Sequence, residues 1–246
     1  MIVIPMAGLS SRFSAAGYVG PKFMLPLGGK TVFDRAVGSF GAYFTDVPFL
    51  FIARGGAPVS EFVAQSCAAL GIKNLQIEML SGPTAGQAET VELGLKSAGV
   101  PGGTPITIFN IDTFRPGFQF PDQPWSASAA GYLEVFRGEG SNWSYVRPAA
   151  DASDRVIETA EKRPISNLCC TGLYHFARTQ DFLDSLALER RKPSTAELYV
   201  APLYNHLIRQ GMAIHYRLVA ASEIVFCGVP SEYEAMLAGE PSSTST

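Results

Sequence analysis

Cysteine is scarce in this sequence, and its placement excludes a disulfide framework or a thiolate metal site. The four cysteines are Cys67, Cys169, Cys170 and Cys227, and none belongs to a CxxC pair. Zinc sites and redox-active pairs usually carry that spacing. We therefore predict four reduced thiols, buried as small apolar side chains in a cytoplasmic protein.

Charge of one sign and long apolar runs are also lacking. The 246 residues carry 19 Lys and Arg against 22 Asp and Glu, a formal net charge of −3, without a basic stripe. No nucleic-acid partner is expected, so an anionic ligand must be held by a few placed cations and backbone N–H groups. No run approaches the roughly 20 apolar residues of a membrane helix, and the apolar start at residues 2–5 is too short for a signal peptide. We predict a cytoplasmic location and no membrane partner.

The chain nonetheless has enough apolar residues for a large core. Hydrophobic residues make up 47 % of it, and one α/β domain can reach about 250 residues. We predict a single domain at residues 1–238, followed by a disordered polar tail at residues 239–246.

Hydrophobic patterning alternates between strands and helices in the first half. Apolar runs predict strands at residues 2–5, 48–53, 74–80 and 105–109. Helical spacing predicts helices at residues 31–42, 58–70 and 88–98. This order is typical of a Rossmann-like α/β domain with a mostly parallel central sheet. Ligands of such sheets bind beyond the carboxyl ends of the strands, where Gly8 and Asp112 lie.

The second half changes character, because turn residues separate short apolar segments. Strands are predicted at residues 129–136, 143–147, 155–160 and 169–176. Helices are predicted at residues 179–190 and 196–210. We expect these strands to form an antiparallel extension of the same sheet, which supplies an acceptor site.

The loop after the first strand has the residues of a phosphate-binding loop. It reads Met-Ala-Gly-Leu-Ser-Ser-Arg-Phe over residues 6–13, and a Pro-Lys pair ends at Lys22. Gly8 lets the backbone approach a ligand, Arg12 can hold phosphate oxygens with two N–H groups, and Lys22 supplies a point charge. A plain strand-to-helix turn with two solvated cations would explain the same residues.

The loop together with the Pro-Lys pair resembles the signature of the sugar-phosphate nucleotidyltransferases, the nucleoside-diphosphate-sugar pyrophosphorylases. The chain is most similar to the short members found in capsule and surface-polysaccharide gene clusters. The resemblance implies a Rossmann-like fold of the GT-A type and catalytic roles for Arg12 and Lys22. It also implies nucleotide binding by Ala7, Gly8, Ser10, Ser11 and Arg12. The family often has further glycines where this loop has Leu9, Ser10 and Ser11.

Two further segments resemble the nucleotide and metal sites of the family. Thr-Ala-Gly-Gln-Ala at residues 84–88 matches the segment whose Gln reads the nucleobase, which assigns that role to Gln87. Asn110-Ile111-Asp112 matches the metal-binding turn, which assigns Mg²⁺ binding and catalysis to Asp112. Taken singly, Gln87 also fits a polar helix start, and Asp112 fits an ordinary turn.

The acceptor site is predicted from Glu161-Lys162 and from the Thr-Gly segment at residues 171–172. The resemblance implies that Glu161, Lys162 and Thr171 bind the phosphorylated acceptor. Neighbours on a strand point to opposite faces, so Glu161 and Lys162 can reach one ligand only if the strand ends there. A solvated ion pair at a strand end is the alternative.

The C-terminal part departs from the family pattern. Many members carry a second metal-binding Asp where this sequence has Phe226. Glu223, three residues upstream, is the candidate replacement. Asp112 is therefore the one metal ligand that the resemblance assigns.

Together these residues predict an enzyme that uses Mg²⁺, an NTP and a small phosphorylated substrate. It would transfer a nucleoside monophosphate to a sugar 1-phosphate and release pyrophosphate, for surface or capsular polysaccharide precursors. The alternatives are a cytidylyltransferase for a non-sugar acceptor, a GT-A type glycosyltransferase, and a non-catalytic nucleotide-binding module. Glycosyltransferases usually show Asp-x-Asp, whereas this turn begins with Asn110. The base, the acceptor and the oligomeric state stay open.

Overall fold

The computed structural model describes residues 1–151 and 153–239, so the predicted tail after Gly239 lies outside the described residues. The helices are α1 (Ser11–Ala15), α2 (Val32–Gly38), α3 (Ala57–Leu70), α4 (Gln87–Ser97), α5 (Thr179–Arg191), α6 (Tyr204–Arg209) and α7 (Pro230–Leu237). No described helix is long and apolar enough to cross a membrane.

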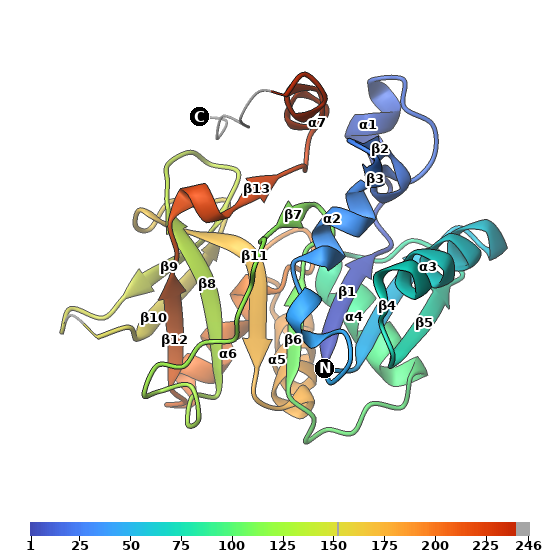
Figure 1. The fold of residues 1–246 in the computed structure, drawn as a ribbon. Coiled ribbons are helices and arrows are strands. Elements are labelled where there is room, and N and C mark those ends of the chain that lie inside the picture. The colour runs from blue at the N-terminus through green and yellow to red at the C-terminus, as the bar shows by residue number, and fades with distance from the viewer. Residues whose placement is uncertain (152, 240–246) are drawn as a thin grey trace.

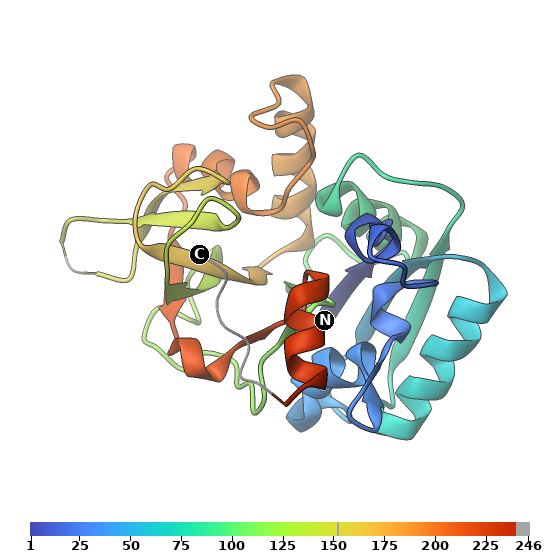
Figure 2. The same cartoon turned by 90° about the horizontal axis from the view of Figure 1, so that it is seen from above.

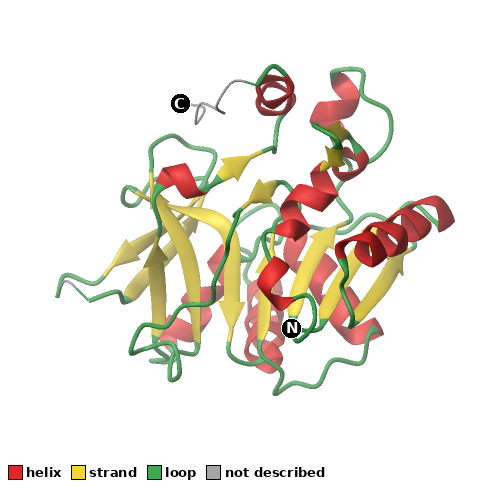
Figure 3. Cartoon of the chain, in the orientation of Figure 1, coloured by secondary structure: helices red, strands yellow, loops and turns green. Residues whose placement is uncertain are grey.

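The strands alternate with these helices in the first half and follow one another in the second (Figure 1, Figure 3). They are β1 (Ile2–Met6), β2 (Pro26–Leu27), β3 (Lys30–Thr31), β4 (Phe49–Arg54), β5 (Leu75–Leu80), β6 (Ile106–Phe109), β7 (Thr113–Phe114), β8 (Gly131–Arg137), β9 (Ser144–Pro148), β10 (Val156–Glu161), β11 (Leu168–Phe176), β12 (Ile214–Leu218) and β13 (Val225–Phe226).

The first half forms the parallel part of the sheet, as predicted. Its strand order is β6-β1-β4-β5, and all three pairings are parallel. Ile2 and Ile4 pack on one face with α2 and α3, whereas Val3 packs on the other face with α4 and α5. Figure 2 shows α3 (cyan) and α5 (orange) on opposite sides of the sheet. Strands that are buried on both faces read as continuous apolar runs, which explains why these strands were predictable.

The second half extends the sheet mostly through antiparallel pairs. β11 pairs antiparallel with β6 on one side and with β8 on the other, and β9 and β10 form a further antiparallel pair. β12, which the sequence pattern did not indicate, pairs parallel with β8. The mixed sheet therefore has the predicted architecture, with one additional parallel strand.

The helix predicted at residues 196–210 is wrong in its first half. α6 begins only at Tyr204, after a single 3₁₀ turn. Upstream, Leu198 donates its N–H to the carbonyl of Ala85 at 2.9 Å and accepts from the N–H of Ala88 at 2.8 Å. These bonds use backbone groups that a helix would need for its own ladder.

The end of the described chain returns to its beginning. The hydroxyl of Tyr233 in α7 donates to the carbonyl of Pro26 at 2.6 Å. The ring of Tyr233 lies 6.0 Å from Phe13 in α1 and 5.4 Å from Tyr18. Figure 1 shows α7 (red) beside α1 (blue) above the carboxyl ends of the parallel strands. The first loop is thereby held between the sheet and α7.

Candidate active site

A cavity of about 900 Å³ opens beyond the carboxyl ends of the parallel strands. The loop after β1, the start of α4 and the turn after β6 line one part of it. The ends of β10 and β11 and the residues around β13 line another part. The predicted site residues all lie in its wall, namely Ala7, Gly8, Ser10, Ser11, Arg12, Lys22, Gln87, Asp112, Glu161, Lys162 and Thr171.

Lys22 and Asp112 form an ion pair at the centre of this arrangement. The two residues are 90 positions apart, and Lys22 Nζ donates to Asp112 Oδ2. Their side chains are 19 % and 25 % exposed, so the pair is partly shielded from water and still accessible to a ligand. The main-chain carbonyl of Asp112 accepts from the N–H of Cys227 at 2.8 Å, which joins the turn after β6 to the C-terminal segment.

The first loop carries a serine in a backbone conformation that favours glycine. Ser10 has φ 52° and ψ 30°, the left-handed region, which costs an L-residue roughly 1–2 kcal/mol. Its hydroxyl accepts the backbone N–H of Lys22 at 3.1 Å, which ties the loop to the catalytic candidate. Arg12 in α1 is exposed, and its guanidinium bonds to none of the described residues.

The start of α4 is fixed by a close approach of two backbones. A Cβ on Gly86 would lie 2.5 Å from the carbonyl oxygen of Leu198, so only glycine fits. The next residue, Gln87, is half-buried and donates from Nε2 to Asn110 Oδ1 at 2.6 Å. A base contact by Gln87 would therefore use its amide oxygen or its second N–H hydrogen.

In another part of the cavity wall, β10 ends at Glu161, and Lys162 has a left-handed φ of 52°. The predicted strand end is confirmed, and both side chains reach the cavity. Ser144 donates its hydroxyl to Glu161, whose pKa is raised by burial. Lys162 Nζ donates to the hydroxyl of Tyr199 at 2.7 Å, and this bond raises the pKa of Lys162. Neither Ser144 nor Tyr199 carried a motif that could have indicated its place.

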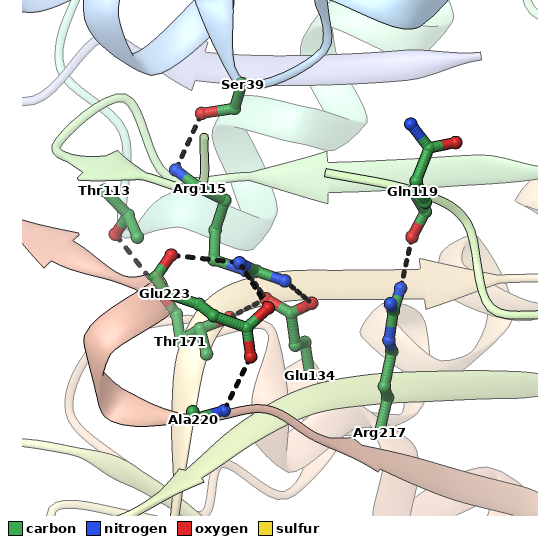
Figure 4. Close-up of polar contacts among 9 residues, drawn as sticks. All are labelled: Ser39, Thr113, Arg115, Gln119, Glu134, Thr171, Arg217, Ala220 and Glu223. Carbon is green, nitrogen blue, oxygen red and sulfur yellow. Dashed lines mark hydrogen bonds and ion pairs between the residues drawn. The ribbon is translucent and has the colours of Figure 1, made fainter. Parts of the chain in front are cut away.

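Thr171 differs from its neighbours because its hydroxyl is turned into the core. It is 1 % exposed and donates to Glu134 Oε1 at 3.2 Å. Glu134 in turn accepts two bonds from Arg115, at 2.7 and 3.1 Å, and both residues are buried (Figure 4). Arg115 also donates to the carbonyl of Glu223 at 2.9 Å. This network connects the turn after Asp112 with the cavity wall and the C-terminal segment.

No protein-family model matches the chain, and no curated protein does, but solved structures match over almost its full length. The nucleoside-diphosphate-sugar pyrophosphorylase from Vibrio cholerae RC9 is 52 % identical, with 97 % of this chain and 100 % of that chain covered and a TM-score of 0.92. The chain belongs to the nucleoside-diphosphate-sugar pyrophosphorylase family.

More distant structures of the same fold carry nucleotidyltransferase descriptions. The inositol-1-phosphate CTP transferase from T. maritima is 14 % identical, covers 96 % of this chain and 94 % of its own, and has a TM-score of 0.72. The UTP-bound UGPase from Acinetobacter baumannii is 15 % identical, covers 97 % and 92 %, and has a TM-score of 0.70. At this low identity the similarity shows the fold alone. The assignment of this chain as a nucleotidyltransferase of the family rests on the Vibrio relative.

Phe226, at the position where the sequence pattern led us to look for a second metal-binding Asp, lies in the C-terminal wall of the cavity. The ring of Phe226 lies 4.6 Å from Trp143 and 5.4 Å from Phe136, and it offers no donor to a metal. Glu223, the candidate replacement, accepts from the N–H of Ala220 at 2.8 Å and lies 3.5 Å from Arg115 Nη1. The Glu223 side chain is 50 % exposed and does not line the cavity, so it meets the buried network only at its edge.

A different carboxylate, that of Glu232 in α7, faces Asp112 across Gly228. A Cβ on Gly228 would lie 3.4 Å from Asp112 Oδ2 and 3.7 Å from Glu232 Oε2. Burial, reinforced by the charge of Asp112, raises the pKa of Glu232. Glu232 Oε2 also accepts the N–H groups of Gly228 and Val229, at 2.7 and 3.2 Å. Both carboxylates line the cavity, and hard oxygen donors suit Mg²⁺, which takes few protein ligands and keeps waters and substrate phosphates. Accordingly, within the described residues no group of three or more His, Cys, Asp or Glu side chains forms a complete cage.

The cysteines are buried free thiols, as predicted. Cys170 and Cys227 lie near the site, and burial raises the pKa of Cys227 to about 12 and that of Cys170 well above its ordinary value. A protonated thiol is a poor nucleophile, so neither side chain suits covalent catalysis.

Proposed function

We propose that this enzyme transfers a nucleoside monophosphate from an NTP to a sugar 1-phosphate and releases pyrophosphate. The observation that carries the proposal is the shared cavity, which has the Lys22–Asp112 pair beside the first loop and Glu161 with Lys162 in another part of its wall. Two anionic substrates can thus lie in one space of about 900 Å³. The proposal includes residues 1–238 as one catalytic domain and a use of the product for surface or capsular polysaccharide.

The NTP is assigned to the first loop and to the start of α4. Backbone groups of Ala7 and Gly8 and the hydroxyls of Ser10 and Ser11 would lie along the phosphates. Arg12, which is exposed at the cavity, would bind the phosphates with its guanidinium. Gln87 would read the base edge, at a position that Gly86 and Leu198 hold in place.

Asp112, with Glu232 on the other side of Gly228, would hold Mg²⁺ in the cavity wall. When bound, the ion would neutralise phosphate charge and polarise the α-phosphate. Lys22, which is paired with Asp112 in the free enzyme, would meet the phosphates of the bound NTP with its ammonium group. Lys22 therefore serves as a mobile cation, paired with Asp112 in the free enzyme and with the substrate during transfer.

The acceptor is assigned to Glu161, Lys162 and the wall at Thr171. Lys162 would bind the acceptor phosphate, and Glu161, which lines the cavity beside it, would accept from ring hydroxyls. Thr171 would contribute through its backbone, because its hydroxyl donates to Glu134.

For this reaction the protein must position the two substrates and neutralise their charge. The acceptor phosphate is already an anion at neutral pH, so it can attack the α-phosphorus without a general base. The leaving group is pyrophosphate. The main barrier is the repulsion between two anionic substrates, which Arg12, Lys22 and Lys162 would offset.

The decisive experiment is a matrix of the four NTPs against phosphorylated acceptors, with pyrophosphate as the readout. The acceptors are hexose 1-phosphates, inositol 1-phosphate, glycerol 3-phosphate and phosphocholine. We expect release with at least one hexose 1-phosphate, and at least 100-fold less in Asp112→Asn, since a lost metal ligand removes about 3 kcal/mol or more of transition-state stabilisation. Asp122→Asn, an exposed Asp outside the cavity, is the matched control. No release with any pair would refute the proposal.

A further inference from the structure

Two aromatic side chains form part of the cavity wall without a role in the transfer described above. Trp143 and Phe226 are half-buried, their ring centroids lie 4.6 Å apart, and both line the cavity. Beneath them Phe136 is 1 % exposed and lies 5.1 Å from Trp143 and 5.4 Å from Phe226. We call Trp143 and Phe226 the aromatic platform, because a buried ring supports both and their outer parts face the cavity.

The platform adjoins the residues assigned to the acceptor. The carbonyl of Trp143 accepts the N–H of Lys162 at 2.9 Å, and the next residue, Ser144, donates to Glu161. Phe226 is the register partner of Thr113, directly after Asp112. The platform thus lies between the acceptor pair and the metal-binding turn, along the length that an acceptor must span.

The orientation of the platform is fixed before any ligand arrives. The indole N–H of Trp143 donates to the carbonyl of Glu139 at 3.2 Å, and Phe226 is held in the β7–β13 pair. When an apolar surface covers half-exposed rings, water is removed from both surfaces. This contributes about 25 cal/mol of binding free energy per Å² of apolar surface buried. A rigid apolar wall with a few placed polar groups opposite is the usual composition of a small-molecule site.

The groups around the platform select one class of ligand. Glu161 is a shielded carboxyl group suited to hydroxyl donors, and Lys162 is a cation suited to a phosphate. A ligand that matches all three features has a phosphate, a hydroxylated edge and a flat apolar face of C–H groups. A sugar ring has these features, whereas a short open-chain phosphate has no face to cover two rings.

We propose that Trp143 and Phe226 are specificity-determining residues, on which the sugar ring of the acceptor packs during transfer. The inference rests on the proposed function and extends it to residues that no motif indicated. It also explains why the sequence has Phe226 where the family pattern has a metal-binding Asp, because the phenyl ring completes the platform.

Tryptophan fluorescence tests binding without turnover. The chain has two tryptophans, and Trp125 stacks on His215 at 4.9 Å outside the cavity wall. In Trp125→Phe, Trp143 is the single reporter. Glucose 1-phosphate, galactose 1-phosphate, glycerol 3-phosphate and phosphocholine are titrated with each α,β-methylene NTP analogue present, which allows ordered binding and blocks transfer. We expect a saturable emission change with a sugar 1-phosphate, and none in Trp143→Phe, which keeps Trp125.

Steady-state kinetics test the specificity role. Trp143→Leu and Phe226→Leu should each raise the acceptor KM about tenfold or more, since loss of an aromatic face removes ring contact, and should leave the NTP KM within about twofold. Trp125→Leu, the matched control, should change neither. An unchanged acceptor KM, or an equal rise in the NTP KM, overturns the platform.

The two proposals fail in different ways. Absence of pyrophosphate release with every substrate pair refutes the proposed function, and the titration then judges the platform alone. A saturable change with a sugar 1-phosphate supports the platform, and no change overturns it. An equal or larger response to phosphocholine overturns the assignment to a sugar ring, because it indicates a cation on the aromatic faces.

Discussion

The buried Arg115–Glu134 pair makes a sharp prediction about stability. Glu134→Gln keeps the shape of the side chain and removes its charge. The side chains of Arg115 and Glu134 are 2 % and 0 % exposed, so the guanidinium would lose its buried counter-charge and keep only the half-exposed carboxylate of Glu223 at 3.5 Å. Breaking a buried pair in this way costs about 3–5 kcal/mol. At about 2–4 °C per kcal/mol for a chain of this size, we expect Tm to fall by about 6–20 °C.

An exposed ion pair on the same sheet is the matched control. Arg147 and Glu158 lie 3.1 Å apart with side chains 45 % and 32 % exposed. Glu158→Gln should therefore cost no more than about 1 kcal/mol. Thermal unfolding of both variants followed by circular dichroism, together with urea unfolding at pH 7, measures the difference.

A double-mutant cycle separates the pair from ordinary packing. Arg115→Met and Glu134→Leu should each destabilise strongly, whereas the double variant should cost less than the sum, because neither charge is then left alone. If Glu134→Gln lowers Tm no more than Glu158→Gln, or if the single effects simply add, the buried-charge argument is refuted.

Three further predictions concern single residues. Ser10→Ala should lower kcat severalfold, because the backbone N–H of Lys22 loses its hydrogen bond to the Ser10 hydroxyl. Ser10→Gly should lower kcat by a similar factor but raise the unfolding temperature, because glycine relaxes the left-handed backbone. An unchanged kcat in both variants contradicts this prediction. Gly86→Ala should destabilise the enzyme and raise the NTP KM, whereas Gly82→Ala, with open space around it, should do neither. Burial lowers the pKa of His175 to about 4. As the pH falls below about 6.5, the unfolded chain therefore takes up a proton before the folded protein does. The free energy of unfolding should fall by up to about 3 kcal/mol between pH 6.5 and about 4. In His175→Gln that fall should shrink, as unfolding free energies across this range can test.

The parallel half of the fold was predictable because its signals are local. Residues 2–4 and 49–52 are buried on both faces of the sheet, so each strand reads as an unbroken apolar run. The proposed site residues could be chosen because each motif stands at a strand end or helix start, and strand ends of a parallel sheet gather at one edge. The placement of Lys22 beside Asp112 follows from that geometry.

Elsewhere the outcome depended on partners far away in the chain. The helix predicted from residue 196 is displaced because Leu198 bonds to the segment before α4. β12 was missed because its few apolar residues pair with β8, which is separated from it by more than seventy positions. The secondary structure of such segments is determined by a distant contact, which no local sequence pattern encodes.

The sequence alone determined the alternation of strands and helices in the first half and the family, through apolar runs and motifs that each act within a few residues. Tertiary structure decided which groups meet in the cavity wall. Trp143 directly precedes β9, whereas Phe226 lies in β13 and Glu232 in α7. Phe226 and Glu232 reach the cavity wall because the C-terminal segment crosses back over the sheet. Their positions follow from the buried Arg115–Glu134 network and from α7 packing on the first loop. The bonds from Arg115 to Glu223 and from Tyr233 to Pro26 join segments more than a hundred residues apart, and no pattern within a single segment can specify them.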